Sequence, residues 1–309
     1  MTDNAVAAAR SVDAANAAYR KGVLCVLITT LLWSTGGIVV RSVEASSAWH
    51  ILLYRSLGLL PALLLIIWLT SRGRVIAAFR AAGWPGVLGG VALVVSSTGA
   101  IVSMKETTIA NATLLWGTSP FWTALLAWLM LGETVRRATL LVLPVAALGM
   151  AIMVSGDLGS GRIAGNLWAL LCAIGFGFFN VALRWRPGVD MTPAVFLSGI
   201  YTVLVAAGVI ATQGMPFEVP VRDFVLSFSL GICQIGLGLY FYTLGSKSLP
   251  AVELALLTLL EALFGPLWVW LLFNETPSRE TILGGGILIG AIIVNAASGI
   301  RRRRSPVAP

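Results

Sequence analysis

Long apolar runs with few charges follow one another along almost the whole of this chain. A helix needs about 20 apolar residues to cross the hydrocarbon core of a bilayer, where every backbone polar group must be satisfied within the helix. The gaps between the runs are short, so no soluble domain is predicted between them. We predict an all-α polytopic membrane protein with ten transmembrane helices, at residues 22–40, 48–70, 83–104, 108–131, 138–156, 163–184, 192–212, 222–246, 250–273 and 281–300.

Composition supports this class of protein. Of the residues, 58% are hydrophobic and only 11% are charged, whereas soluble domains carry about 25% charged residues. One soluble core could not bury so much apolar surface, so the lipid bilayer is a predicted partner. The net charge of +8 comes from Lys and Arg in the short gaps and at Arg301–Arg304. That placement orients membrane proteins, and we expect no binding to nucleic acid.

The basic residues also predict the orientation. Of the 21 Lys and Arg residues, 15 lie on the side that holds both termini, five lie on the other side, and Arg55 lies within the second predicted helix. Because cytoplasmic loops carry the excess of Lys and Arg, we expect a multi-pass protein of the cell inner (plasma) membrane with cytoplasmic termini. Residues 1–20 lack the apolar core of a signal peptide. They are predicted to be a cytoplasmic N-terminal tail, and residues 301–309 a basic cytoplasmic tail.

The sequence also repeats itself with an offset of 142 residues. Under this offset residues 132–134 match residues 274–276, and near the start an offset of 143 places Trp33 on Phe176. Five helices are an odd number, so the two halves must insert with opposite topology. Inverted repeats are typical of secondary transporters, which bind substrate near the membrane midplane where the repeats meet. The predicted five-helix repeats are residues 21–156 and 157–300.

Three motifs occur in order along residues 21–300. They are Leu-Leu-Trp-Ser-Thr-Gly at residues 31–36, Thr118-Ser119-Pro120 followed by Leu131-Gly132-Glu133, and Leu260-Glu261-Ala262 followed by Asn274-Glu275. In order and spacing they resemble the drug/metabolite transporter (DMT) superfamily, and within it the EamA-type family of ten helices in two five-helix repeats. Ala262 departs from the pattern, because the family often has proline there.

The resemblance implies a secondary transporter that exports small organic solutes by alternating access through a central cavity. The Trp-Ser-Thr run of the first helix and the many aromatic residues at candidate pore positions resemble the aromatic amino-acid exporters of the YddG type. Aromatic or large apolar amino acids are therefore the predicted substrates. Export of other metabolites or of drugs is the alternative within the same family.

Other classes of protein agree less well with the sequence. A membrane-embedded enzyme needs a catalytic constellation, but the chain has no HExxH or GxSxG motif and has a single histidine, His50. It has no P-loop either, so ATP is not the direct energy source. Its three cysteines form no CxxC pair, and a receptor would be expected to carry an extramembrane domain. We predict no catalytic residue, no metal site and no cofactor.

Aromatic and polar residues at membrane depth favour a central substrate cavity. Lipid would leave the polar groups unsatisfied, and aromatic rings can stack on a solute or bind a cation. Helix packing, lipid contact and bonds to the residue's own helix are the alternative roles. Phe179 and Tyr242 are further aromatic candidates. The predicted substrate-binding residues are Trp33, Ser34, Ser96, Trp116, Ser119, Phe176, Asn180, Tyr240 and Glu261.

Three charged residues lie well inside predicted helices. Glu261 is the deeper of two carboxylates, and it is either a site for a substrate amine or a proton, or a hydrogen-bonded structural group. Glu253 lies near a helix start, where the helix dipole favours an anion. Arg55 lies one to two turns from the periplasmic end of its helix, where it either snorkels to the interface or guides a carboxylate.

Overall fold

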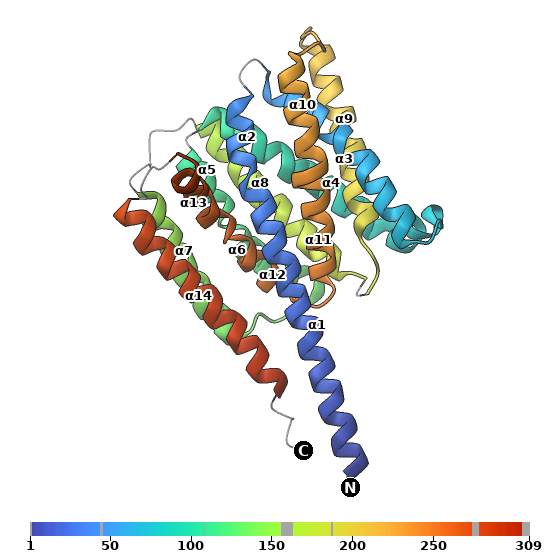
Figure 1. Cartoon of the computed structure of the whole chain (residues 1–309), viewed down its shortest axis with the longest axis vertical. Coiled ribbons are helices and arrows are strands. Elements are labelled where there is room, and N and C mark those ends of the chain that lie inside the picture. Colours follow the sequence, from blue (N-terminus) through green and yellow to red (C-terminus); the bar gives the residue numbers. More distant parts are fainter. Residues whose placement is uncertain are drawn as a thin grey trace.

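The computed structural model describes residues 2–43, 46–107, 109–155, 163–186, 188–273 and 278–304. These residues form helices and no strand. Figure 1 shows the helices packed into one bundle, with the beginning of the first helix and the end of the last helix at the same end. Within the described residues, six helices are long and apolar enough to cross a membrane, and Arg137–Met153 is a shorter apolar helix. The predicted all-α polytopic membrane fold is confirmed.

Single helices account for several of the predicted spans. Three of them, α3 (Ala48–Thr70), α8 (Ile163–Arg184) and α9 (Thr192–Thr212), have the predicted bounds. Hydropathy is reliable here because each of these helices is mostly apolar and polar or turn-forming residues follow it. Two more, α7 (Arg137–Val154) and α14 (Arg279–Arg304), begin within two residues of their predicted starts.

The third predicted span forms the larger part of α4 (Val75–Glu106), which is kinked. The kink falls at Gly83, whose φ of 56° lies in the left-handed region that favours glycine. Backbone groups that a kink releases need other partners, and Arg186 supplies one by donating a hydrogen bond of 2.7 Å from Nη1 to the Ala81 carbonyl. The predicted span began at residue 83 because the residues before the kink are less apolar.

The first membrane helix is longer than its predicted span. Helix α1 (Thr2–Ser34) includes most of the N-terminal segment, and α2 (Gly36–Ser42) follows after a break at Thr35. Figure 1 shows α1 extending beyond the bundle towards the N-terminus. Many alanines favour a helix in residues 2–20, and Tyr19 is already buried, with 2% of its surface exposed. This part of the chain therefore continues the membrane helix.

Two membrane spans are broken in the same way. The fourth consists of α5 (Ile109–Trp116) and α6 (Ser119–Leu131), and the ninth of α12 (Ala251–Thr258) and α13 (Glu261–Phe273). Adding 142 to the bounds of α5 and α6 gives the bounds of α12 and α13. The break after α5 is followed by Pro120, which lies in the first turn of α6. The offset seen in the sequence is thus an offset of structural elements, as two inverted repeats require, although the matching motif at residues 274–276 lies outside the described residues.

The eighth span contains a different irregularity. It runs through α10 (Val221–Ser229), a π-helical segment η2 (Leu230–Gly236) and α11 (Leu237–Ser246). Gly231 lies so close to α3 that a Cβ there would be 1.9 Å from the Arg55 carbonyl oxygen. Such π-segments occur often at functional sites, and this one brings Gln234 towards α1.

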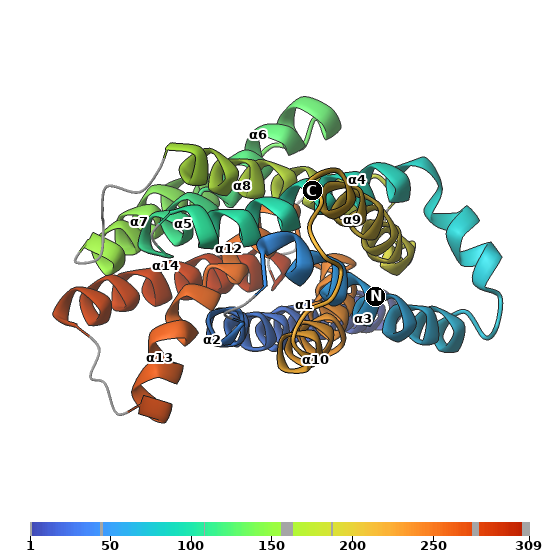
Figure 2. The ribbon, with the colours of Figure 1, turned by 90° about the horizontal axis from the view of Figure 1, so that it is seen from above.

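The two repeats pack against each other through the centre of the bundle. From the first repeat, α4 and α6 pack on α8, and α1 packs on α11, α12 and α13 of the second. Helices α7 and α14 lie side by side along one flank, as Figures 1 and 2 both show. Residues contributed by α1, α6, α8, α11 and α13 therefore meet at the interface between the repeats.

The excess of Lys and Arg on one side predicts which loops are cytoplasmic. The first helix begins and the last helix ends on that side. In a variant without the three native cysteines, Arg74→Cys should react with a membrane-impermeant maleimide only after the cells are permeabilised. Glu218→Cys should react in intact cells, because it lies in the exposed loop after α9, on the opposite side. Labelling of Arg74→Cys in intact cells would reverse the orientation.

Candidate functional site

The two helix breaks place helix starts inside the membrane. Ser119 begins α6 and Glu261 begins α13, and the 142-residue offset relates the two positions. The first N–H groups of a helix have no partner within the helix, and its start carries a partial positive charge. In transporters with inverted repeats, half-helices of this kind typically form the substrate site. Ser119 is buried and Glu261 is partly exposed.

Four aromatic rings gather between the repeats. Trp33 of α1 stacks on Tyr242 of α11 with 5.5 Å between ring centroids, and meets Phe176 of α8 edge-on at 5.6 Å. Phe176 lies 5.3 Å from Tyr242, and Phe179 completes the group at 6.2 Å from both. Phe179 and Tyr242 are fully buried, whereas Trp33 and Phe176 keep partial exposure. We call these four residues the aromatic cluster; its accessible surface belongs to Trp33 and Phe176.

The indole of Trp33 is held tightly but has an unused donor. A Cβ at Gly238 would lie 2.4 Å from Trp33 Nε1, so only glycine fits there. Gln234 Nε2 donates a hydrogen bond of 2.8 Å to the Trp33 carbonyl oxygen, close to the break between α1 and α2. Trp33 Nε1 is buried without a hydrogen-bond partner among the described residues. A buried N–H of this kind costs free energy until an acceptor reaches it.

Asn180 belongs to a hydrogen-bonded chain that joins three helices. Tyr242 Oη donates to Asn180 Oδ1 at 2.5 Å, and Asn180 Nδ2 donates to Thr123 Oγ1 at 3.1 Å. Thr123 Oγ1 in turn donates to the Ser119 carbonyl oxygen at 2.8 Å. Asn180, Thr123 and Tyr242 are all fully buried. The chain fixes the tyrosine ring of the aromatic cluster relative to the start of α6, and Asn180 uses both ends of its amide for this.

Ser34 and Trp116 are each the last residue before a helix break. Ser34 is the last residue of α1, and its hydroxyl accepts a hydrogen bond of 2.8 Å from Trp268 Nε1 on α13. It also donates to the Leu31 carbonyl of its own helix at 2.8 Å. Trp116 is the last residue of α5, and its Nε1 is buried without a partner among the described residues. Ser34 thus ties α1 to the broken ninth span.

Ser96 and Cys172 connect α4 to α8. Their Oγ and Sγ atoms are 3.6 Å apart, and both residues are buried. Cys172 is also within electrostatic reach of Glu261 and of Arg55. Cys172, Phe176 and Asn180 are spaced by four residues, so they share one face of α8. These three residues of α8 thus contact or approach the first repeat from Ser96 on α4 to Thr123 on α6.

Tyr240 lies apart from the aromatic cluster. Its ring meets Phe241 at 5.6 Å, and its hydroxyl is within electrostatic reach of Asp190 and Cys25. Residues two apart on a helix point about 200° from each other, so Tyr242 faces the cluster while Tyr240 faces elsewhere. The sequence alone could not tell which of the two tyrosines faces the cluster.

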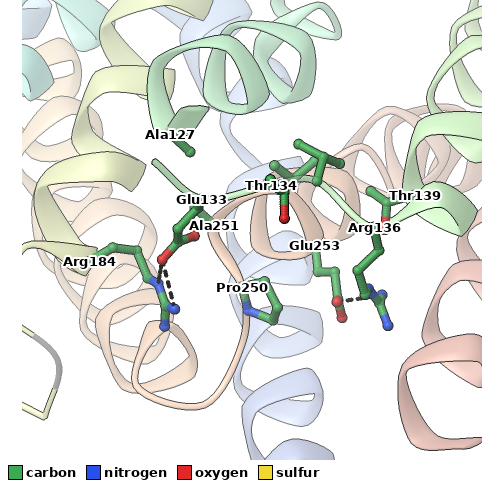
Figure 3. A pocket seen from close by; sticks show the side chains of 11 residues that line it. Ala127, Glu133, Thr134, Arg136, Thr139, Arg184, Pro250, Ala251 and Glu253 are labelled. Atoms are coloured by element: carbon green, nitrogen blue, oxygen red, sulfur yellow. Dashed lines mark hydrogen bonds and ion pairs between the residues drawn. The ribbon is translucent and has the colours of Figure 1, made fainter. Parts of the chain in front are cut away.

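A cavity of about 240 Å³ lies at the end of the bundle where the loops after α6 and α8 meet the start of α12. Figure 3 shows two ion pairs on either side of Pro250, Glu133 with Arg184 and Arg136 with Glu253. Both pairs join the first repeat to the second. Glu253 is 3% exposed and also accepts a hydrogen bond of 2.9 Å from Tyr19 Oη. We call this group of five charged and hydroxyl side chains the ion-pair end.

The sequence identified only part of the ion-pair end. Glu253 was predicted to be an anion at a helix start, and it lies in the first turn of α12. Its partners Arg136 and Tyr19 are more than 100 residues away along the chain, so no local pattern could pair them. The Lys247–Asp190 pair, with Nζ 3.4 Å from Oδ2, lies within the second repeat and is partly exposed.

The fold and its interior define a multi-pass membrane protein of the inverted-repeat transporter class. The model of the EamA-like transporter family matches the chain twice, at residues 20–155 and 163–297. The chain therefore belongs to the EamA-like transporter family. This agrees with the resemblance found in the sequence motifs.

Named relatives are transporters as well. The chain is 27% identical to the pseudopaline exporter CntI of Pseudomonas aeruginosa over 89% of its own length and 95% of that protein. It is 24% identical to an uncharacterised transporter of Archaeoglobus fulgidus over 63% of its length and 69% of that protein. A protein of known crystal structure superposes with a TM-score of 0.74 at 22% identity, covering 92% of this chain and 99% of the other, which shows the shared fold.

The Tyr242–Asn180–Thr123 chain makes a prediction about stability. Tyr242→Phe keeps the ring but removes the donor to Asn180, and leaving a buried acceptor unpaired costs about 1–3 kcal/mol. We expect a lower melting temperature for the detergent-purified protein. Asn180→Ala should also destabilise it, and the double variant should lose less than the sum of the two, because the residues interact directly. Strict additivity would contradict the hydrogen bond.

Proposed function

We propose that this chain is a secondary exporter of small amphipathic organic solutes, with aromatic or large apolar amino acids as the favoured substrates. One observation supports it most: accessible faces of Trp33 and Phe176 meet between the repeats, and α13, which begins at Glu261, packs on the helix that carries Trp33. An aromatic surface packs against an apolar side chain, and a carboxylate attracts a protonated amine. The Ser34, Ser96, Trp116 and Ser119 side chains surround this space in the proposal.

The residues of the proposed site have different proposed roles. Trp33 offers a free indole N–H as well as its ring. Asn180 holds Tyr242 in place, so its proposed role is to position the aromatic surface. Tyr240 faces away from the aromatic cluster, and its proposed role is to contact the solute outside that cluster. Glu261 has no ion-pair partner among the described residues, and it is proposed to receive the solute's amine.

Transport by alternating access requires one end to be closed while the other opens. We propose that the ion-pair end faces the cytoplasm and is closed in this structure, because both of its ion pairs bridge the two repeats. Opening that end would separate Arg136 from Glu253 and Glu133 from Arg184. The energy needed comes from a solute gradient or a coupled ion, as in secondary transporters.

A second candidate substrate comes from the relatives. The CntI protein is an exporter of pseudopaline, and the similarity to it covers 89% of this chain. Export of pseudopaline or of a compound like it is therefore the alternative substrate proposal. Counterflow into proteoliposomes, with amino acids and pseudopaline as separate preloaded solutes, would decide between the two.

Trp33→Ala should slow counterflow of every amino acid that the wild type transports. Loss of an aromatic contact costs about 1 kcal/mol, which corresponds to a roughly fivefold loss. Trp128→Ala is the matched control, because Trp128 is 58% exposed on the outer surface of α6. Transport should be compared at equal amounts of folded protein. If Trp33→Ala and Glu261→Gln both transport as fast as the wild type, the proposed site is wrong.

Weakening the ion-pair end should open it more often. In a variant without native cysteines, Val252→Cys reports access, because Val252 lines the cavity and is 6% exposed. Adding Glu253→Gln should speed its labelling in inside-out vesicles about tenfold, since a broken buried ion pair is strongly destabilising. Glu133→Gln should have a smaller effect, because Glu133 and Arg184 are 36% and 27% exposed and exposed pairs contribute little. Unchanged labelling with Glu253→Gln would contradict this role.

A further inference from the structure

Arg55 is a buried cation within a membrane helix. It lies seven residues after the start of α3, about 10 Å along the helix, and only 6% of it is exposed. Its Nη2 donates a hydrogen bond of 3.0 Å to Ser97 Oγ on α4. Ser97 is itself nine residues before the end of α4, about 14 Å deep. The guanidinium therefore points into the bundle, and it does not extend to the membrane interface.

In the part of the chain that the structure describes, no carboxylate forms an ion pair with Arg55. Among the described residues, the ion pairs join other basic side chains, and none includes Arg55. A guanidinium has five N–H donors in a planar fork, and the bond to Ser97 uses one of them. A charged group in the membrane interior is costly and usually faces a wet cavity or a pathway. The remaining donors are thus available to a ligand that carries negative charge.

The surroundings of Arg55 connect it to the proposed transport site. Two neighbouring serines of α4 contact residues of two other helices. Ser97 accepts a hydrogen bond from Arg55 of α3, and Ser96 contacts Cys172 of α8. Cys172 lies on α8, which packs closely on α4. One turn further along α8 on the same face lies Phe176 of the aromatic cluster. Arg55 is thus linked through α4 and α8 to the accessible aromatic surface, and Glu261 begins α13, which packs on α1, the helix that carries Trp33.

We propose that Arg55 binds the carboxylate of the transported solute, and that this selects solutes carrying a carboxylate beside an apolar group. The proposal rests on the proposed function, because it assigns the substrate class of the same site. The guanidinium fork matches the two oxygens of a carboxylate, whereas an ammonium offers only a compact point charge. Trp33 and Phe176 hold the apolar part, and Glu261 receives an amine when the solute has one.

Ligand-induced thermal stabilisation of the purified full-length protein tests the proposal without relying on transport. The probes are 3-phenylpropionate, its uncharged amide 3-phenylpropionamide, and 2-phenylethylamine. The wild type should bind 3-phenylpropionate at least about tenfold more tightly than the amide, because only the acid can pair with Arg55. Arg55→Gln should abolish this preference but leave the binding of 2-phenylethylamine unchanged. Arg55→Lys should keep a weaker preference, since it retains the charge and loses the fork.

Arg80→Gln is the matched control, because it removes an exposed arginine from α4 and should keep the wild-type preference. A wild type that binds the acid and the amide equally overturns the proposal. So does an Arg55→Gln variant that is folded and still prefers the acid. Counterflow of L-phenylalanine on the same samples separates the two ideas: transport without an Arg55-dependent preference leaves the exporter standing and removes the Arg55 assignment. A preference without transport supports the binding site and contradicts amino-acid export.

Discussion

Backbone polar groups inside a bilayer have no water to bond with, and this constraint shapes the interior of the protein. Each membrane helix that breaks releases carbonyl and N–H groups that other parts of the protein must satisfy. Side chains meet this need: Gln234 bonds the Trp33 carbonyl near the break after α1, and Thr118 bonds the Leu115 carbonyl in the last turn of α5. Such breaks can therefore form only between packed helices, which is also where a solute can be enclosed.

The sequence predicted the fold well because hydropathy and charge act over whole helices. Three helices have the predicted bounds, and the 142-residue offset holds for the broken spans to the residue. The breaks themselves were not predicted, and in the ninth span the two residues between the helices, Leu259 and Leu260, are apolar. The length of α1 was also missed, because its first 20 residues are too polar for a hydropathy window although their alanines favour a helix.

Prediction of the site was limited by helix faces and by distant contacts. Trp33 and Phe176 were matched as repeat partners, and their rings are in contact. Tyr242 bonds to Asn180, and Trp268 bonds to Ser34. No spacing in the sequence reveals these two contacts. The same holds for the pairing of Arg136 with Glu253. Depth in the membrane can be read from a single sequence, but the direction in which a side chain points depends on tertiary packing.

Helix α1 carries Tyr19 at the ion-pair end and Trp33 in the aromatic cluster. These residues are 14 positions apart on one unbroken helix, which separates them by about 21 Å. A rigid rod that is tilted moves at both of its ends together. A solute that displaces the indole of Trp33 from Tyr242 would therefore also shift the hydroxyl that holds Glu253. In mechanical terms α1 is a rod that joins the aromatic cluster to the ion-pair end, so the positions of Trp33 and Tyr19 are coupled.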